Sequence, residues 1–190
     1  NVARDFGPEA ARLVARSSRT AIDHIAATAA ALGIECSFER VPGYLYTERE
    51  EHIAGLELEL EAALDAGLAV TRVEDPLPFV TRAALRFENQ AQFQPIDYVK
   101  GLAQHLRMEG TRIYEHSRVV SIDEDEPCVV RTESGATVRA GYVVVATHAP
   151  LNKLLLQTKL ASYRSYVVAG AVEKAPQGLF WDTEDSYHYV

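Results

Sequence analysis

Tyr142-Val-Val-Val-Ala-Thr-His148 closes the stretch of sequence, residues 111–148, that decides the fold. Residues 142–147 carry aromatic, β-branched and small side chains without a charge, which is the pattern of a strand buried on both faces. The preceding segments alternate in polarity and are separated by the turns 123–126 and 133–135. The stretch predicts a small β-meander that leads into a fully buried strand. The predicted meander strands are Thr111–Glu115, Arg118–Ile122, Cys128–Thr132 and Thr137–Ala140.

Helical periodicity dominates three other segments. Pro8–Leu32 has proline in its first turn and Gly33 after its end, with an apolar stripe from Val14 to Leu32. Thr47-Glu-Arg-Glu50 has the spacing of a capping box and predicts a second helix through Leu64. The third helix follows Gln94-Pro95 and ends at Gly110, and we expect it to turn the following residues inward: Val99, Leu102, Ala103 and Leu106.

A period of two in the remaining segments predicts further strands. They are Val41–Tyr46, Leu68–Val73, Val80–Phe87, Ser162–Val172 and Gly178–Val190. Together with the helices they predict an α/β (α+β mixed) protein with a mixed sheet.

Composition excludes several classes of function. The net charge is −8 and the 19 Lys and Arg residues are scattered, so we expect no nucleic-acid partner. No apolar run approaches the roughly 20 residues that cross a bilayer, and no signal-peptide pattern is present, so we expect no membrane span and a cytoplasmic location. The six histidines and two cysteines lack the spacing of metal ligands, and we expect no metal site.

The order of these elements resembles the D-amino-acid oxidase superfamily of FAD-dependent oxidoreductases. Ala84–Pro95 and Gly178-Leu-Phe-Trp-Asp182 are similar to its bacterial branch, whose members often add a Rieske iron–sulfur domain. The resemblance implies a partial FAD/NAD(P)-binding domain interleaved with a mixed-sheet substrate domain. Residues 1–35 and 94–152 would belong to the FAD domain, and residues 36–93 and 153–190 to the substrate domain.

The resemblance also implies which residues contact FAD. Val119 is expected to hold the adenine through its backbone groups, and Ala146 and Thr147 to let the cofactor approach the end of a buried strand. The family pattern continues with glycine, where this chain has His148. A side chain there restricts close approach and positive φ. His148 could stack on or hydrogen-bond the cofactor, or it could be a structural residue.

The sequence gives less information about the substrate than about the cofactor. In the family a hydride passes from a carbon bearing an amine or hydroxyl group to the flavin, and the protein mainly orients the substrate. The candidates for the substrate pocket are Tyr44, Arg164 and His188, with the nearby tyrosines Tyr46, Tyr163, Tyr166, Tyr187 and Tyr189. For each of them a role in sheet packing or at the surface stays open, and no catalytic residue can be named.

No Gly-x-Gly-x-x-Gly lies between a strand and a helix in the 190 residues, and the chain starts at Asn1. We therefore interpret the sequence as an internal part of a longer enzyme, with FAD in the intact protein but not in this fragment. The alternative is a non-catalytic binding or assembly module without a flavin site. In either case the edge of the sheet beside residues 142–147 would be uncovered, which favours self-association.

Overall fold

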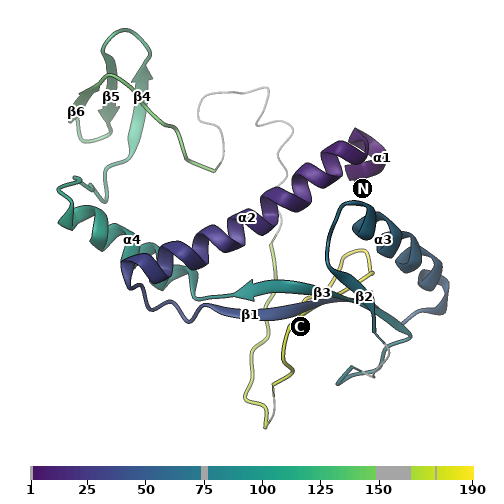
Figure 1. The fold of residues 1–190 in the computed structure, drawn as a ribbon. Coiled ribbons are helices and arrows are strands. Elements are labelled where there is room, and N and C mark those ends of the chain that lie inside the picture. The colour runs from purple at the N-terminus through teal and green to yellow at the C-terminus, as the bar shows by residue number, and fades with distance from the viewer. Residues whose placement is uncertain (1, 74–76, 149–163, 174) are drawn as a thin grey trace. The chain divides into compact units, whose positions relative to one another are not determined.

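The computed structural model describes residues 2–73, 77–148, 164–173 and 175–190 (Figure 1). The chain forms two compact units, residues 1–111 with 173–190, and residues 112–172. Helices and strands occur together with a mixed sheet, so the predicted α/β (α+β mixed) class is confirmed. The division into FAD and substrate domains concerns which residues serve each ligand. Compactness does not test that division, and it stays a prediction.

Two long helices of the first unit lie where the sequence predicts them. After the short α1 (Val2–Phe6), α2 spans Pro8–Leu32 and ends at Gly33, whose φ of 63° is the left-handed conformation that glycine adopts at low cost. The helix α4 spans Pro95–Met108. The predicted inward faces are only partly correct. Val14, Val99 and Leu106 are exposed.

The predicted capping box is wrong. Thr47 is the last residue of β1 (Glu39–Thr47) and is fully buried, and its Oγ1 accepts a hydrogen bond from the Arg49 N–H at 3.1 Å. The chain then makes the 3₁₀ turn η1 (Glu50–His52) before α3 (Ile53–Asp65) begins. Thr47 stays in the strand because the Thr47 carbonyl accepts a hydrogen bond from the Arg82 N–H at 2.7 Å. Because Thr47 is paired with β3, the helix begins several residues later than the sequence predicts.

The first unit contains a four-stranded sheet with the order β2-β3-β1-β7. Besides β1, its strands are β2 (Val70–Arg72), β3 (Ala83–Gln92) and β7 (Leu179–Asp182). β3 pairs antiparallel with both β1 and β2, whereas β7 pairs parallel with β1. The sheet is therefore mixed, as predicted, and β7 joins it from more than 130 positions along the chain.

Alternate residues divide this sheet into two faces. The helix-covered face carries Leu45 and Leu85 and packs on α3 through Leu56 and Ala63. Figure 1 shows α2 and α3 against the sheet. The opposite face, which we call the aromatic face, carries Tyr44, Tyr46, Ala84 and Phe180 and is covered in part by Val73, Leu77 and Phe79. The faces differ in kind, since helices cover one and aromatic rings fill the other.

The second unit contains the predicted meander. β4 (Val119–Asp123), β5 (Cys128–Thr132) and β6 (Thr137–Ala140) form an antiparallel sheet in chain order. Residues 111–115, also predicted as a strand, have no regular structure. Cys128 is half-buried and Cys36 in the first unit is buried, both as free thiols.

The predicted buried strand at residues 142–147 is wrong for this structure. The segment is not in a strand, and the exposed fractions of Tyr142 and Val144 are 95% and 89%. A strand needs a neighbour to take its backbone N–H and C=O groups, and the described residues place no strand beside this one. The same reason applies to residues 164–172, which are exposed and outside any strand, while residues 162 and 163 lie outside the described residues. No described helix has the length and apolarity needed to cross a membrane.

Candidate functional site

The aromatic face carries a cluster of packed rings. Tyr44 stacks on Phe180 with ring centroids 4.8 Å apart and planes 7° apart. Phe79 meets Phe180 edge to face at 5.2 Å and approaches Tyr46 at 4.9 Å. These separations lie in the range of favourable aromatic pairs. The rings therefore form one connected cluster between the sheet and the 77–80 segment.

Asp182 follows Phe180 by two residues on β7 and therefore lies on the same face. It is the parallel neighbour of Tyr46, just as Phe180 is the neighbour of Tyr44. The Asp182 side chain is only 10% exposed and accepts three hydrogen bonds. Two come from backbone N–H groups, of Glu184 at 3.1 Å and His188 at 2.9 Å, and the third joins Asp182 Oδ2 to His188 Nδ1 at 2.7 Å.

These contacts determine the charge of the carboxyl group. Burial raises the pKa of Asp182, but the hydrogen bonds from His188 and Glu184 outweigh burial and lower that pKa below its ordinary value. Asp182 is therefore a carboxylate at neutral pH. Burial, followed by the negative charges of Asp182 and Glu48, raises the pKa of Tyr46, so its phenol keeps its proton.

A second polar cluster ties the segment after β7 to η1. His52 Nδ1 lies 3.0 Å from Thr183 Oγ1 and 3.7 Å from Glu184 Oε1, and Arg49 Nη2 lies 2.9 Å from Glu184 Oε2. His52 and Thr183 also line a cavity of about 380 Å³ beside α3. The cluster anchors residues 183 and 184, and thereby the start of the turn that carries His188.

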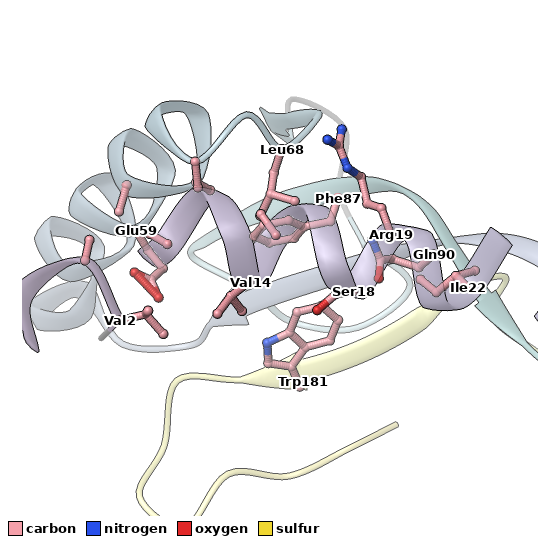
Figure 2. Close-up of a pocket in the computed structure, with 16 residues that line it drawn as sticks. Val2, Val14, Ser18, Arg19, Ile22, Glu59, Leu68, Phe87, Gln90 and Trp181 are labelled. Atoms are coloured by element: carbon pink, nitrogen blue, oxygen red, sulfur yellow. The ribbon is translucent and has the colours of Figure 1, made fainter. Parts of the chain in front are cut away.

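A second cavity, lined mainly by apolar side chains, lies on the helix-covered face (Figure 2). Its volume is about 360 Å³, within the lower range of small-molecule sites, and its walls come from α1, α2, α3, β3 and β7. Phe87 and Trp181 form its floor, and Arg19 stands at one side. Arg19 is engaged with the Gly67 carbonyl at 3.2 Å, and no residue predicted to bind cofactor or substrate lines this cavity.

The structure brings together some of the predicted substrate residues and not others. Tyr44 and Tyr46 share the aromatic face, and His188 reaches that face through Asp182. Tyr187 and Tyr189 pack on each other edge to face. Arg164 and Tyr166 are exposed residues of the second unit, outside any helix or strand, and Tyr163 lies outside the described residues.

The residues predicted to contact FAD all belong to the second unit. Val119 begins β4, is half-buried and pairs with Thr132. Ala146, Thr147 and His148 are exposed and follow the meander without regular structure. His148 has a φ of 64°, the left-handed conformation that glycine adopts without the steric penalty of a Cβ.

Sequence reasoning missed Phe79, Phe180 and Asp182. The alternation of Phe180 and Asp182 along one short strand was the available signal, because residues two apart share a face. The partner strand that makes them neighbours of Tyr44 and Tyr46 could not be read from it.

Comparison with known proteins gives consistent results. The model of the DAO family, described as FAD dependent oxidoreductase, matches residues 3–190. A protein of Bacillus subtilis (strain 168), named as a Rieske 2Fe-2S iron-sulfur protein, YhfW, is 31% identical over 181 residues, which are 93% of this chain and 36% of that protein. Gamma-glutamylputrescine oxidoreductase of Escherichia coli (strain K12) is 40% identical over 68 residues, 36% of this chain and 16% of that protein.

Among solved structures, L-proline dehydrogenase from P. horikoshii has the same fold over 73% of this chain and 38% of its own, with a TM-score of 0.57 and 19% identity. The chain thus spans little more than a third of the length of the YhfW protein and of the L-proline dehydrogenase. The family model nevertheless covers nearly all of its residues. The chain belongs to the DAO family of FAD-dependent oxidoreductases.

Proposed function

We propose that these 190 residues are part of a longer FAD-dependent enzyme that oxidises an amine, an amino acid or a hydroxy compound by hydride transfer to the flavin. The family match over residues 3–190 carries this proposal. The relative named gamma-glutamylputrescine oxidoreductase favours an amine among these substrates. The comparisons do not favour the alternative of a non-catalytic binding or assembly module.

The residues present fit one part of FAD. A strand-start valine, Val119, and the small exposed residues Ala146 and Thr147 allow backbone contact with the nucleotide end, and the positive φ of His148 keeps the backbone turn that glycine would make. The glycine-rich turn that would bind the pyrophosphate is not among these residues. Under the proposal, residues outside this sequence supply it. FAD, when bound, accepts the hydride.

On the substrate side, the proposal assigns the aromatic face. The Tyr44 and Tyr46 rings would bound the apolar part of the substrate, and their hydroxyl groups can donate hydrogen bonds to it. Arg164 belongs to the second unit, and we propose independently of the aromatic face that it pairs with a substrate carboxylate, because a guanidinium matches that group in shape and charge. A Rieske partner domain, a cytoplasmic location and self-association beside residues 142–147 belong to the same proposal.

Flavin content tests the proposed function directly. The longer protein is expected to purify with the visible absorbance of oxidised flavin, and this absorbance should bleach when a substrate amine is added without oxygen. The 190-residue chain alone should show no saturable FAD binding in the micromolar range, because its sequence lacks the pyrophosphate turn. A longer protein that stays colourless after incubation with FAD would refute the proposal that it is a flavoenzyme.

His148→Gly examines the cofactor side in the same longer protein. Glycine tolerates the positive φ of residue 148 better than histidine does, so FAD affinity should stay within about tenfold of the wild type or improve, a change of at most about 1.4 kcal/mol. The dissociation constant can be measured by flavin fluorescence in a titration of the apoprotein. A loss of FAD greater than tenfold would instead identify the imidazole as a ligand.

A further inference from the structure

Asp182 and His188 form a pair in which one partner is buried and the other is exposed. The Asp182 side chain is 10% exposed, the His188 side chain is 72% exposed, and the Oδ2–Nδ1 distance is 2.7 Å. A short contact of this kind is a strong, charge-assisted hydrogen bond when the imidazole is protonated. The buried carboxylate therefore holds one edge of an imidazole ring whose other edge faces outward.

The backbone holds this pair in register. The chain returns along β7 after the turn, with Phe180 and Val190 exchanging N–H to C=O hydrogen bonds at 3.2 and 2.9 Å. The Asp182 N–H donates to the His188 carbonyl at 3.2 Å, and Trp181 forms a bridge with Tyr189. Residue 188 is thereby set directly beside residue 182. The ring position does not depend on the side-chain contact alone.

The contact determines the tautomer of neutral His188. Asp182 is a carboxylate and can only accept, so Nδ1 must carry the proton that it shares with Asp182 Oδ2. The lone pair is then on Nε2, which points away from the buried partner. A base oriented in this way by a carboxylate is a common arrangement for proton transfer in enzymes.

We propose that His188 Nε2 accepts the proton of the substrate ammonium group, and that Asp182 is the positioning residue that holds His188 for this step. This inference rests on the proposed function, with an amine as substrate. His188 is the catalytic residue in this scheme. Asp182 is the strand neighbour of Tyr46, so the pair lies next to the aromatic face that carries Tyr46 and Phe180.

An N–H bond of the substrate ammonium group breaks, and an Nε2–H bond forms on His188, so the amine regains its lone pair. The neutral amine could then give up the hydrogen of the adjacent C–H bond with its bonding electrons as a hydride, which FAD, when bound, would accept, and the substrate would be left as an iminium ion, the protonated imine. The resulting imidazolium is stabilised by Asp182. It can release its proton to solvent, because the His188 side chain is largely exposed.

The groups around the pair fit this assignment. On β1, the Tyr46 phenol keeps its proton and so adds no charge beside Asp182. Glu48 follows the end of β1 and acts on Tyr46, whose pKa its negative charge helps to raise. Within the turn, the Glu184 carboxylate is paired with Arg49 and lies near His52, and Tyr187 and Tyr189 contact each other. Asp182 is thus a negative group in direct contact with the His188 ring.

Asp182 could instead serve only to shape the turn, since it also accepts the Glu184 N–H two residues on. Asp182→Asn separates the two roles. The asparagine oxygen can still accept the backbone N–H groups, but its amide can donate to Nδ1, which would move the imidazole proton to Nε2. In the longer flavoprotein, the nitrogen NMR shifts of His188 should report Nδ1–H in the wild type and Nε2–H in this variant.

The second measurement is flavin reduction without oxygen, with γ-glutamylputrescine and L-proline as probe amines. His188→Gln and Asp182→Asn should each slow reduction by about 100-fold or more in the pH range where the wild-type imidazole is neutral and the substrate amine is still protonated. The deficit should shrink as the pH rises toward the pKa of the amine, because an amine that is already neutral needs no proton acceptor. His24→Gln, an exposed histidine on α2, is the matched control and should keep the wild-type rate at every pH.

The outcomes separate the inference from the function on which it rests. A wild type that holds no flavin, or is reduced by neither amine, overturns the proposed function and this role for His188 with it. A wild type that is reduced, with variants that keep its rate or lose the same factor at every pH, overturns the inference alone. An unchanged His188 tautomer in Asp182→Asn overturns the positioning role of Asp182.

Discussion

Replacing Phe180 by alanine is expected to lower the free energy of unfolding by about 3–5 kcal/mol, the range for removing a large aromatic side chain from a core. Phe180 is 2% exposed and contacts both Tyr44 and Phe79 through ring pairs. It also lies in the middle of β7, a strand of four residues that joins the sheet from a distant part of the sequence. Its loss should loosen the whole aromatic face.

Denaturant unfolding followed by the fluorescence of Trp181, the single tryptophan of the sequence, would measure this effect. Trp181 is the next residue along β7 and points to the opposite face, so its signal reports whether the strand stays paired. Tyr166→Ala is a suitable control, because Tyr166 is 90% exposed and its removal should change stability by no more than about 0.5 kcal/mol. A loss below about 1 kcal/mol for Phe180→Ala would contradict a packed aromatic face.

The second large effect is expected for Gly178→Ala, just before β7. Gly178 has a φ of 133°, which residues with a side chain rarely adopt. An added Cβ would also lie 2.8 Å from Tyr44 Cε2 and 2.9 Å from the Pro42 carbonyl oxygen. Backbone strain and steric overlap together should lower the free energy of unfolding by about 2–4 kcal/mol.

Gly55→Ala provides the matched control in the same unit. Gly55 lies in α3, and a Cβ added there meets nothing within 4 Å. The same chemical change should therefore raise stability by up to about 1 kcal/mol through helix propensity. Equal effects of the two substitutions in thermal or denaturant unfolding would show that β7 does not enter the sheet through the tight turn at Gly178.

The sequence predicted well those elements whose signals are local. Proline at the first turn and glycine after the last bound α2, and turn residues separate β5 from β6 at the predicted positions. Thr47 shows the limit of such signals. Its spacing from Glu50 matches a capping box, but pairing of β1 with β3 keeps Thr47 in the strand. Burial in a sheet stabilised this residue more than a helix cap would, since a cap contributes only about 1 kcal/mol.

Residues 142–147 show a second limit. Their composition is that of a buried strand, yet all of them except Val143 are exposed, and they belong to no strand in the described part of the chain. Hydrophobic periodicity reports what a segment prefers, whereas a strand forms only where another chain segment supplies hydrogen-bond partners. The composition was read correctly, but the burial inferred from it requires a neighbour that the pattern does not contain.

By itself, the sequence determined the class of the fold, the helices, the meander and the membership of an FAD-dependent oxidoreductase family, because these depend on local periodicity, turn chemistry and the order of elements along the chain. The sequence also identified Tyr44, Tyr46 and His188 as candidates for the substrate pocket. Only the tertiary structure decided that they belong together, through Phe180 and Asp182. The pairing of β1 with β7 joins segments more than 130 residues apart, and no local pattern encodes which strands meet or in which register.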